Sequence, residues 1–80
     1  MPKVTFYTRR GCCLCEDARR MLDSARRRTA FDLEEIDIDS DPALKASYDE
    51  EVPVVAIDGR KLFQYRVDLD SLLKRLAAVP

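Results

Sequence analysis

The first part of the chain changes its hydrophobic period from two residues to about 3.6. Residues 3–8, KVTFYT, are rich in β-branched and aromatic side chains and predict a strand. From Leu14 to about Arg28, apolar side chains recur three and four positions apart, as on one face of a helix. Acidic side chains open this segment and arginines close it, which suits the helix dipole at both ends.

The rest of the chain predicts a strand, a short helix, a hairpin and a final helix. Residues 31–39, FDLEEIDID, favour a strand whose apolar side chains change parity, which a bend or an early end of the strand would explain. A short helix is predicted over 40–48. The remaining elements are a hairpin over 52–65 with an Asp58-Gly59 turn, and a helix over 67–79.

This order of elements, β-α-β-α-β-β-α, predicts an α/β fold. The first β-α-β unit places its strands parallel with a right-handed crossover, and the hairpin adds two antiparallel strands. We expect a four-stranded mixed sheet with helices on both faces, formed by residues 1–80 as a single domain. The predicted packing residues are Val4, Phe6, Met21, Leu22, Val54, Ile57, Leu72 and Leu76.

Charge and hydropathy narrow the classes of partner. The formal net charge is −1, so no global electrostatic field recruits nucleic acid or an acidic membrane. No apolar run approaches the roughly 20 residues that span a bilayer, and residues 1–8 lack the apolar stretch of a signal peptide. We expect a cytoplasmic monomer that binds neither nucleic acid nor membrane, in a compartment where thiols are mostly reduced.

The three cysteines of the chain are Cys12, Cys13 and Cys15, which form overlapping C-x-x-C and C-x-C pairs. Such a cluster cannot staple distant segments, and in a reducing compartment it indicates redox chemistry or metal binding. The chain has no histidine, which excludes Cys–His catalysis and mixed Cys/His zinc sites within one chain.

Cys12 is predicted to end the loop before the first helix, where its sulfur faces unpaired backbone N–H groups. Such donors favour the thiolate, so we expect a lowered pKa and a nucleophile at neutral pH. Cys15 lies one helical turn later and closer to the core, and it is the candidate resolving thiol for a mixed disulfide on Cys12. Cys13 is expected to point outward as a free thiol.

The Val52-Pro53 pair opens a predicted strand, an unusual place for proline. We predict that this peptide bond is cis, although only about 5–6% of X–Pro bonds in folded proteins are cis. A cis bond would bring the N–H and C=O of Val52 beside Cys12. An extended peptide or glutathione could then pair with that edge as an added strand.

Together these features resemble glutaredoxin: a strand, C-x-x-C and a helix, then Val-Pro before a strand and an Asp-Gly hairpin. The segment Gly11–Ala18, GCCLCEDA, is similar to the G-C-x-L-C-x-x-A motif of short glutaredoxin-like proteins. The resemblance implies a thioredoxin-like fold, with Cys12 as nucleophile, Cys15 as resolving thiol and Pro53 as the proline that aligns substrate. It also implies that Arg9, three positions before the nucleophile, binds a glutathione carboxylate.

The chain departs from typical glutaredoxins at two places. Cys13 and Leu14 stand between the outer cysteines, where those proteins have Pro-Tyr or a similar pair. Residues 64–68, QYRVD, stand where glutaredoxins carry the Gly-Gly pair that the glutathione backbone approaches closely. Glutathione is accordingly a candidate co-substrate, and no bound cofactor is expected.

These features favour a thiol–disulfide oxidoreductase that reduces protein disulfides or glutathione mixed disulfides through a Cys12/Cys15 dithiol. The candidate substrate-binding residues are Arg9, Val52 and Pro53. One alternative is a thioredoxin-fold binding or redox-sensing module with little turnover. Another is a thiolate module for metal or an iron–sulfur cluster, since soft thiolates suit Cu(I) and zinc. One chain supplies no complete zinc site, so a second chain or glutathione would have to contribute a ligand.

Overall fold

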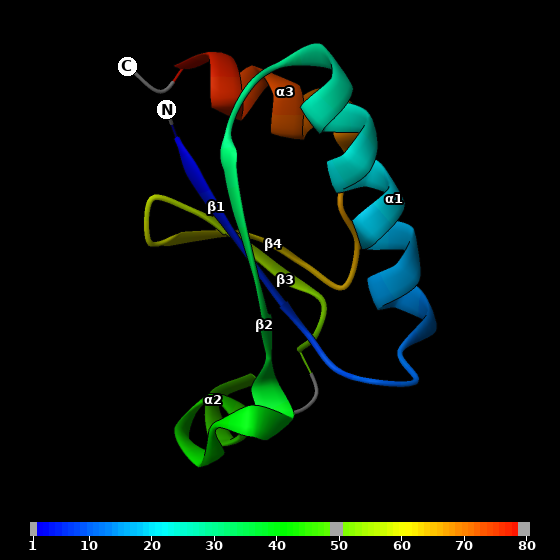
Figure 1. The fold of residues 1–80 in the computed structure, drawn as a ribbon, viewed down its shortest axis with the longest axis vertical. Helices are drawn as coiled ribbons and strands as arrows, with labels where there is room; N and C mark the ends of the chain where they lie inside the picture. The colour runs from blue at the N-terminus through cyan, green and yellow to red at the C-terminus, as the bar shows by residue number, and fades with distance from the viewer. Residues whose placement is uncertain (1, 49–50, 79–80) are drawn as a thin grey trace.

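The computed structural model describes residues 2–48 and 51–78. The elements in chain order are β1 (Lys3–Thr8), α1 (Cys13–Arg28), β2 (Asp32–Asp37), the 3₁₀ turn η1 (Ile38–Ser40), α2 (Pro42–Tyr48), β3 (Val54–Ile57), β4 (Arg60–Gln64) and α3 (Leu69–Ala78). The strands form one sheet in the order β2-β1-β3-β4 (Figure 1). β1 is parallel to β2 and antiparallel to β3, and β3 is antiparallel to β4. The predicted element order and mixed sheet are therefore confirmed.

The main core lies between the sheet and the two longer helices, α1 and α3. Side chains alternate along β1, so that Phe6 and its partner across the strands, Val55, both face this side. The guanidinium of Arg19 in α1 covers the Phe6 ring, 5.6 Å from its centroid. The same buried cluster also includes Val4, Leu22, Ile57, Leu72 and Leu76.

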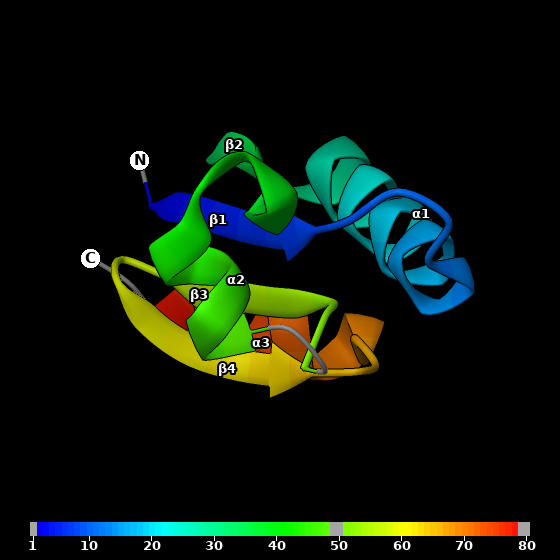
Figure 2. The same ribbon diagram turned by 90° about the horizontal axis from the view of Figure 1, so that it is seen from below.

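The second face of the sheet is covered by α2. Figure 2 shows α2 in front of the strands and α3 behind them. The ring of Tyr7 packs on that of Tyr48 in α2, with 4.8 Å between their centroids. Val54, opposite Tyr7 in the register, is fully buried on this face. Helices on both faces were predicted and are found. Within the described residues, no helix has the length and apolar character needed to cross a membrane.

The predicted second strand is too long at its C-terminal end. β2 stops at Asp37, and the chain turns into η1, where Ile38 is fully buried. The Asp37 carboxylate accepts the N–H of Asp39 at 2.9 Å and so stabilises that turn. The change of parity in the sequence therefore reflects an early end of the strand. Residue 79, at the end of the predicted last helix, lies outside the described residues.

Met21 is the predicted packing residue that the structure places differently. Its side chain is only half-buried, whereas Leu22 beside it is fully buried in the core. A helix face broad enough to hold both residues extends past the edge of the sheet. Met21 instead helps to line a surface groove between α1 and the segment 65–67.

Candidate active site

Cys12 is the N-cap residue of α1, as its predicted position required. Its backbone is extended, and its Sγ accepts a hydrogen bond from the N–H of Cys15 at 3.1 Å. Its carbonyl accepts the N–H of Glu16 at 3.3 Å. Gly11, at φ 74°, supplies the left-handed turn that leads from the loop into this cap. The sulfur therefore lies against the backbone donors that open the helix.

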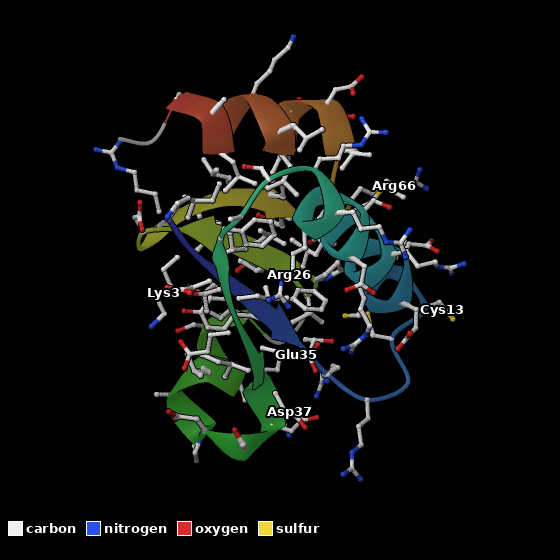
Figure 3. The ribbon with its side chains drawn as sticks, turned by 45° about the horizontal axis from the view of Figure 1, so that its top comes forward. Lys3, Cys13, Arg26, Glu35, Asp37 and Arg66 are labelled. Atoms are coloured by element: carbon white, nitrogen blue, oxygen red, sulfur yellow. The ribbon has the colours of Figure 1, made fainter. Side chains whose placement is uncertain are left out.

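The three cysteines, all free thiols, differ in their exposure to solvent. Cys12 is half-buried, and Cys15 is 1% exposed in the same buried cluster as Val52. Cys13 is exposed, and Figure 3 shows its side chain on the outer side of the first turn of α1. Among residues 2–48 and 51–78, no three His, Cys, Asp or Glu side chains are gathered so that they could hold a metal ion.

The Val52–Pro53 peptide bond is cis, as predicted. Tyr7 lies opposite Val54, so the end of β1 and the start of β3 meet at one end of the sheet. Pro53 and residues 9–12, the cysteine loop between β1 and α1, therefore leave the sheet at the same end. Val52 is 8% exposed and shares the core cluster with Cys15. The carbonyl of Pro53 accepts the N–H of Tyr65 at 2.9 Å, which attaches the end of β4 to the same place.

The environment of Cys12 raises the pKa of its thiol, so the predicted lowering of that pKa is wrong. Burial has the largest effect, and the side-chain hydrogen bond with Cys15 adds to it. The backbone N–H groups of Cys15 and Leu14 lower the pKa, but they do not outweigh desolvation. The prediction rested on the helix N-terminus and did not include the burial that the folded chain imposes on the sulfur.

The family described as "Glutaredoxin-like domain (DUF836)" matches residues 3–77 of the chain. The chain belongs to this glutaredoxin-like family. A glutaredoxin-like protein of Dictyostelium discoideum is 35% identical over 83 residues, which cover 95% of this chain and 76% of that protein. A protein from X. campestris, solved by X-ray crystallography, is 37% identical with a TM-score of 0.77, and the match covers 96% of this chain and 99% of that one.

The fold of this glutaredoxin-like domain is thioredoxin-like. A thioredoxin mutant from Halobacterium salinarum superposes with a TM-score of 0.73 at 20% identity, covering 99% of this chain and 78% of that one. At this identity the likeness concerns the fold alone. The fold implied by the sequence resemblance is thus confirmed.

Arg9 of the glutaredoxin-like domain follows the end of β1 and pairs with η1. Its guanidinium donates to both carboxylate oxygens of Asp39, at 2.8 Å and 3.4 Å. Arg9 also lines a charged pocket of about 330 Å³ with residues of β2, among them Glu35 and Asp37. A substrate carboxylate at Arg9 would compete with Asp39 for the guanidinium.

On its other side, the cysteine loop of the glutaredoxin-like domain adjoins a groove that the sequence did not predict. The groove has a volume of about 370 Å³ and separates α1 from the segment after β4. Tyr65, on its rim, is 44% exposed and has a φ of 72°. The clue in the sequence was the segment 64–68, which has no glycine where the resemblance to glutaredoxins implies a Gly-Gly pair. The lining includes Leu14, Ala18, Met21, Tyr65, Arg66 and Val67.

Proposed function

We propose that this domain is a thiol–disulfide oxidoreductase that reduces disulfides through Cys12 and Cys15. The observation that carries the proposal is the pairing of the two residues at the start of α1. The half-exposed sulfur of Cys12 accepts the N–H of Cys15 at 3.1 Å, and the Cys15 thiol lies beneath it in the core. Membership of the glutaredoxin-like family supports a redox role for such a pair.

The reaction consists of two thiol–disulfide exchanges. The Cys12 thiolate attacks one sulfur of a substrate disulfide, forms a mixed disulfide and releases the other sulfur as a thiolate, which takes up a proton. Cys15, after losing its proton, attacks the Cys12 sulfur and releases the second substrate thiol. Two electrons pass from the protein to the substrate, and a Cys12–Cys15 disulfide remains. A dithiol or glutathione must then reduce that disulfide to complete the cycle.

The raised pKa of Cys12 supports the reducing direction. Dithiols whose thiolate is strongly stabilised are oxidants, with reduction potentials of about −120 mV. The reduction potential of thioredoxin is about −270 mV. Because burial disfavours the Cys12 thiolate, we expect a potential closer to the second value. Such a dithiol acts as a reductant where thiols are kept reduced, as in the cytoplasm.

Substrate is expected to bind along the backbone at Val52 and Pro53. Within the described residues, no backbone hydrogen bond engages the N–H or C=O of Val52. An extended segment of a disulfide-containing protein, or of a glutathione mixed disulfide, can pair there as an added strand. Arg9 is the candidate partner for a glutathione carboxylate, in competition with Asp39.

Single-turnover reduction of insulin by the reduced protein tests the proposal. We expect Cys12→Ser to abolish reduction, and Cys15→Ser to stop at a mixed disulfide that mass spectrometry detects. Cys13→Ser is the matched control, since Cys13 is exposed and adjacent, and it should retain the wild-type rate. Reduction by Cys12→Ser at the wild-type rate would refute the assignment.

A binding or redox-sensing module with little turnover is the second candidate function, and the raised pKa of Cys12 favours low turnover. A smaller thiolate fraction at neutral pH slows attack on disulfides. The two functions differ in turnover with a chemical reductant present. A sensor would become oxidised once and accumulate in that state, whereas an oxidoreductase would release many equivalents of reduced substrate.

A further inference from the structure

Tyr65 occupies a backbone conformation that favours glycine. Its φ of 72° is left-handed, and bulky side chains are genuine outliers in this region. Tyr65 as a whole is 44% exposed, so core packing does not account for the residue. Strained residues of this kind are concentrated at ligand-binding and catalytic sites. The position of Tyr65 fits that tendency, because its N–H is bonded to the carbonyl of Pro53.

The groove beside Tyr65 begins at the first turn of α1 and continues along that helix. Leu14, between Cys12 and Cys15, lines its near end, and Met21, two turns further along the helix, lines its far end. Val67 contributes from the opposite wall. The apolar lining residues, Leu14, Ala18, Met21 and Val67, suit an apolar group of the molecule that Cys12 attacks.

The rim of the groove carries one exposed cation whose charge no ion pair offsets within the described part of the chain. Arg20 pairs with Asp17 at 2.8 Å. Arg66, on the opposite wall, is exposed and forms no such pair among residues 2–48 and 51–78. Figure 3 shows Arg66 alongside α1, at a different point along the helix from Cys13. The groove therefore combines an apolar floor with a positive rim.

We infer that this groove binds an apolar side chain next to the reactive cysteine of a polypeptide substrate, while a nearby carboxylate of that polypeptide pairs with Arg66. The inference rests on the proposed function and names the substrate class of the same site. Glutathione has no large apolar side chain for Leu14 and Met21 to contact. The Tyr65 ring also lines the groove, where it can contact an apolar side chain of the substrate. The preferred substrates are therefore protein disulfides of this composition.

The test compares three mixed disulfides that share thionitrobenzoate as leaving group. The first is a peptide with leucine next to its cysteine and aspartate two residues further on. The second has serine and asparagine at those positions, and the third is glutathione. The Cys12 thiolate takes the peptide or glutathione sulfur and releases the coloured thiolate. We expect the wild-type protein to react with the first at least about tenfold faster than with the others.

Variants locate this preference in the groove. Tyr65→Gly, which suits the left-handed backbone, should reduce the preference for leucine at least about twofold, and Tyr65→Phe should retain it. Arg66→Gln should weaken the contribution of aspartate, whereas Arg27→Gln, an exposed arginine elsewhere on α1, should change nothing. Equal wild-type rates for the three substrates, or a preference that Tyr65→Gly leaves unchanged, would overturn the inference.

A binding measurement separates this inference from the proposed function. The first peptide, with serine in place of cysteine, is titrated into the protein and followed by NMR. We expect shift changes at the Met21 methyl and the Tyr65 ring that saturate, and that Tyr65→Gly weakens. If no substrate releases thionitrobenzoate, the proposed function fails, while saturable binding keeps the groove as a peptide site. If neither residue shows a shift change, the groove is not a peptide-binding site and the inference is refuted.

Discussion

Left-handed backbone occurs at both ends of β4. The residues at the start of the strand suit this conformation, whereas the residue at its end does not. At the start of the strand, Asp58 and Gly59 have φ values of 50° and 87°, and the Asp58 carboxylate accepts the N–H of Lys3 at 3.0 Å. These residues suit a type I′ hairpin turn. At the end of the strand, a tyrosine, Tyr65, holds a φ of 72°.

The difference separates a turn built for stability from a segment built around a site. Residues 58 and 59 meet the conformational demand of the backbone, and no cysteine lies at their end of the sheet. Tyr65 meets that demand poorly, and it lies at the end where Pro53 and the cysteine loop leave the sheet. Substitutions at the turn end, residues 58 and 59, should therefore change the free energy of unfolding. Substitutions at the site end, near Tyr65, Pro53 and the cysteines, should change the rate of disulfide reduction.

The largest expected effect is at the site end, from Cys15→Ala. Without a resolving thiol, the Cys12 mixed disulfide accumulates, so steady-state reduction of a protein disulfide should fall at least about 100-fold. The free energy of unfolding should fall only modestly, because Cys15→Ala removes a single small group from the core. Turnover and urea denaturation measure the two quantities, and turnover near the wild-type rate would show that Cys15 has no resolving role.

A smaller effect is expected at the turn end, from Gly59→Ala. No heavy atom lies within 4 Å of the added methyl group, so the cost comes from the φ of 87° alone. We expect the free energy of unfolding to fall by about 1 kcal/mol in urea denaturation, with unchanged turnover. An equal loss of turnover would mean that the two ends of the sheet are not separable.

Tyr65→Gly should change stability less than Gly59→Ala does. Glycine relieves the left-handed strain, and its greater freedom in the unfolded chain offsets that gain. We expect the free energy of unfolding to stay within about 0.5 kcal/mol of wild type. A loss of several times this amount in urea denaturation would show that the Tyr65 ring serves mainly to stabilise the fold.

The smallest expected effect is a pH shift in the reactivity of Cys12. Its pKa is raised, so alkylation by iodoacetamide should be slow at neutral pH and should keep rising above the pH range of an ordinary thiol. Cys15→Ala removes a hydrogen bond that favours the protonated form, so the pKa of Cys12 should fall. Alkylation profiles with Cys13→Ser as background measure both, and an unchanged or higher pKa would contradict this account.

Local sequence signals predicted the fold well, because each element carries its own pattern. The Asp58-Gly59 turn and the Cys12 cap follow from residues adjacent in the chain, and the cis Val52–Pro53 bond from the place of that pair at the start of a strand. The errors concern effects of distant segments. Spacing alone could not show that burial raises the pKa of Cys12, nor that Met21 faces a groove completed by residues 65–67.

We propose that Cys12 and Cys15 form one redox couple while Cys13 stays free. Differential alkylation of the oxidised protein tests it most directly: the remaining free thiol is labelled, the disulfide is reduced, and the new thiols receive a second label. Tryptic cleavage after Arg10 and Arg19 releases residues 11–19, which tandem mass spectrometry fragments. The account predicts the first label on Cys13 and the second on the other two cysteines. A second label on Cys13, or first labels on all three cysteines under oxidising conditions, would contradict it.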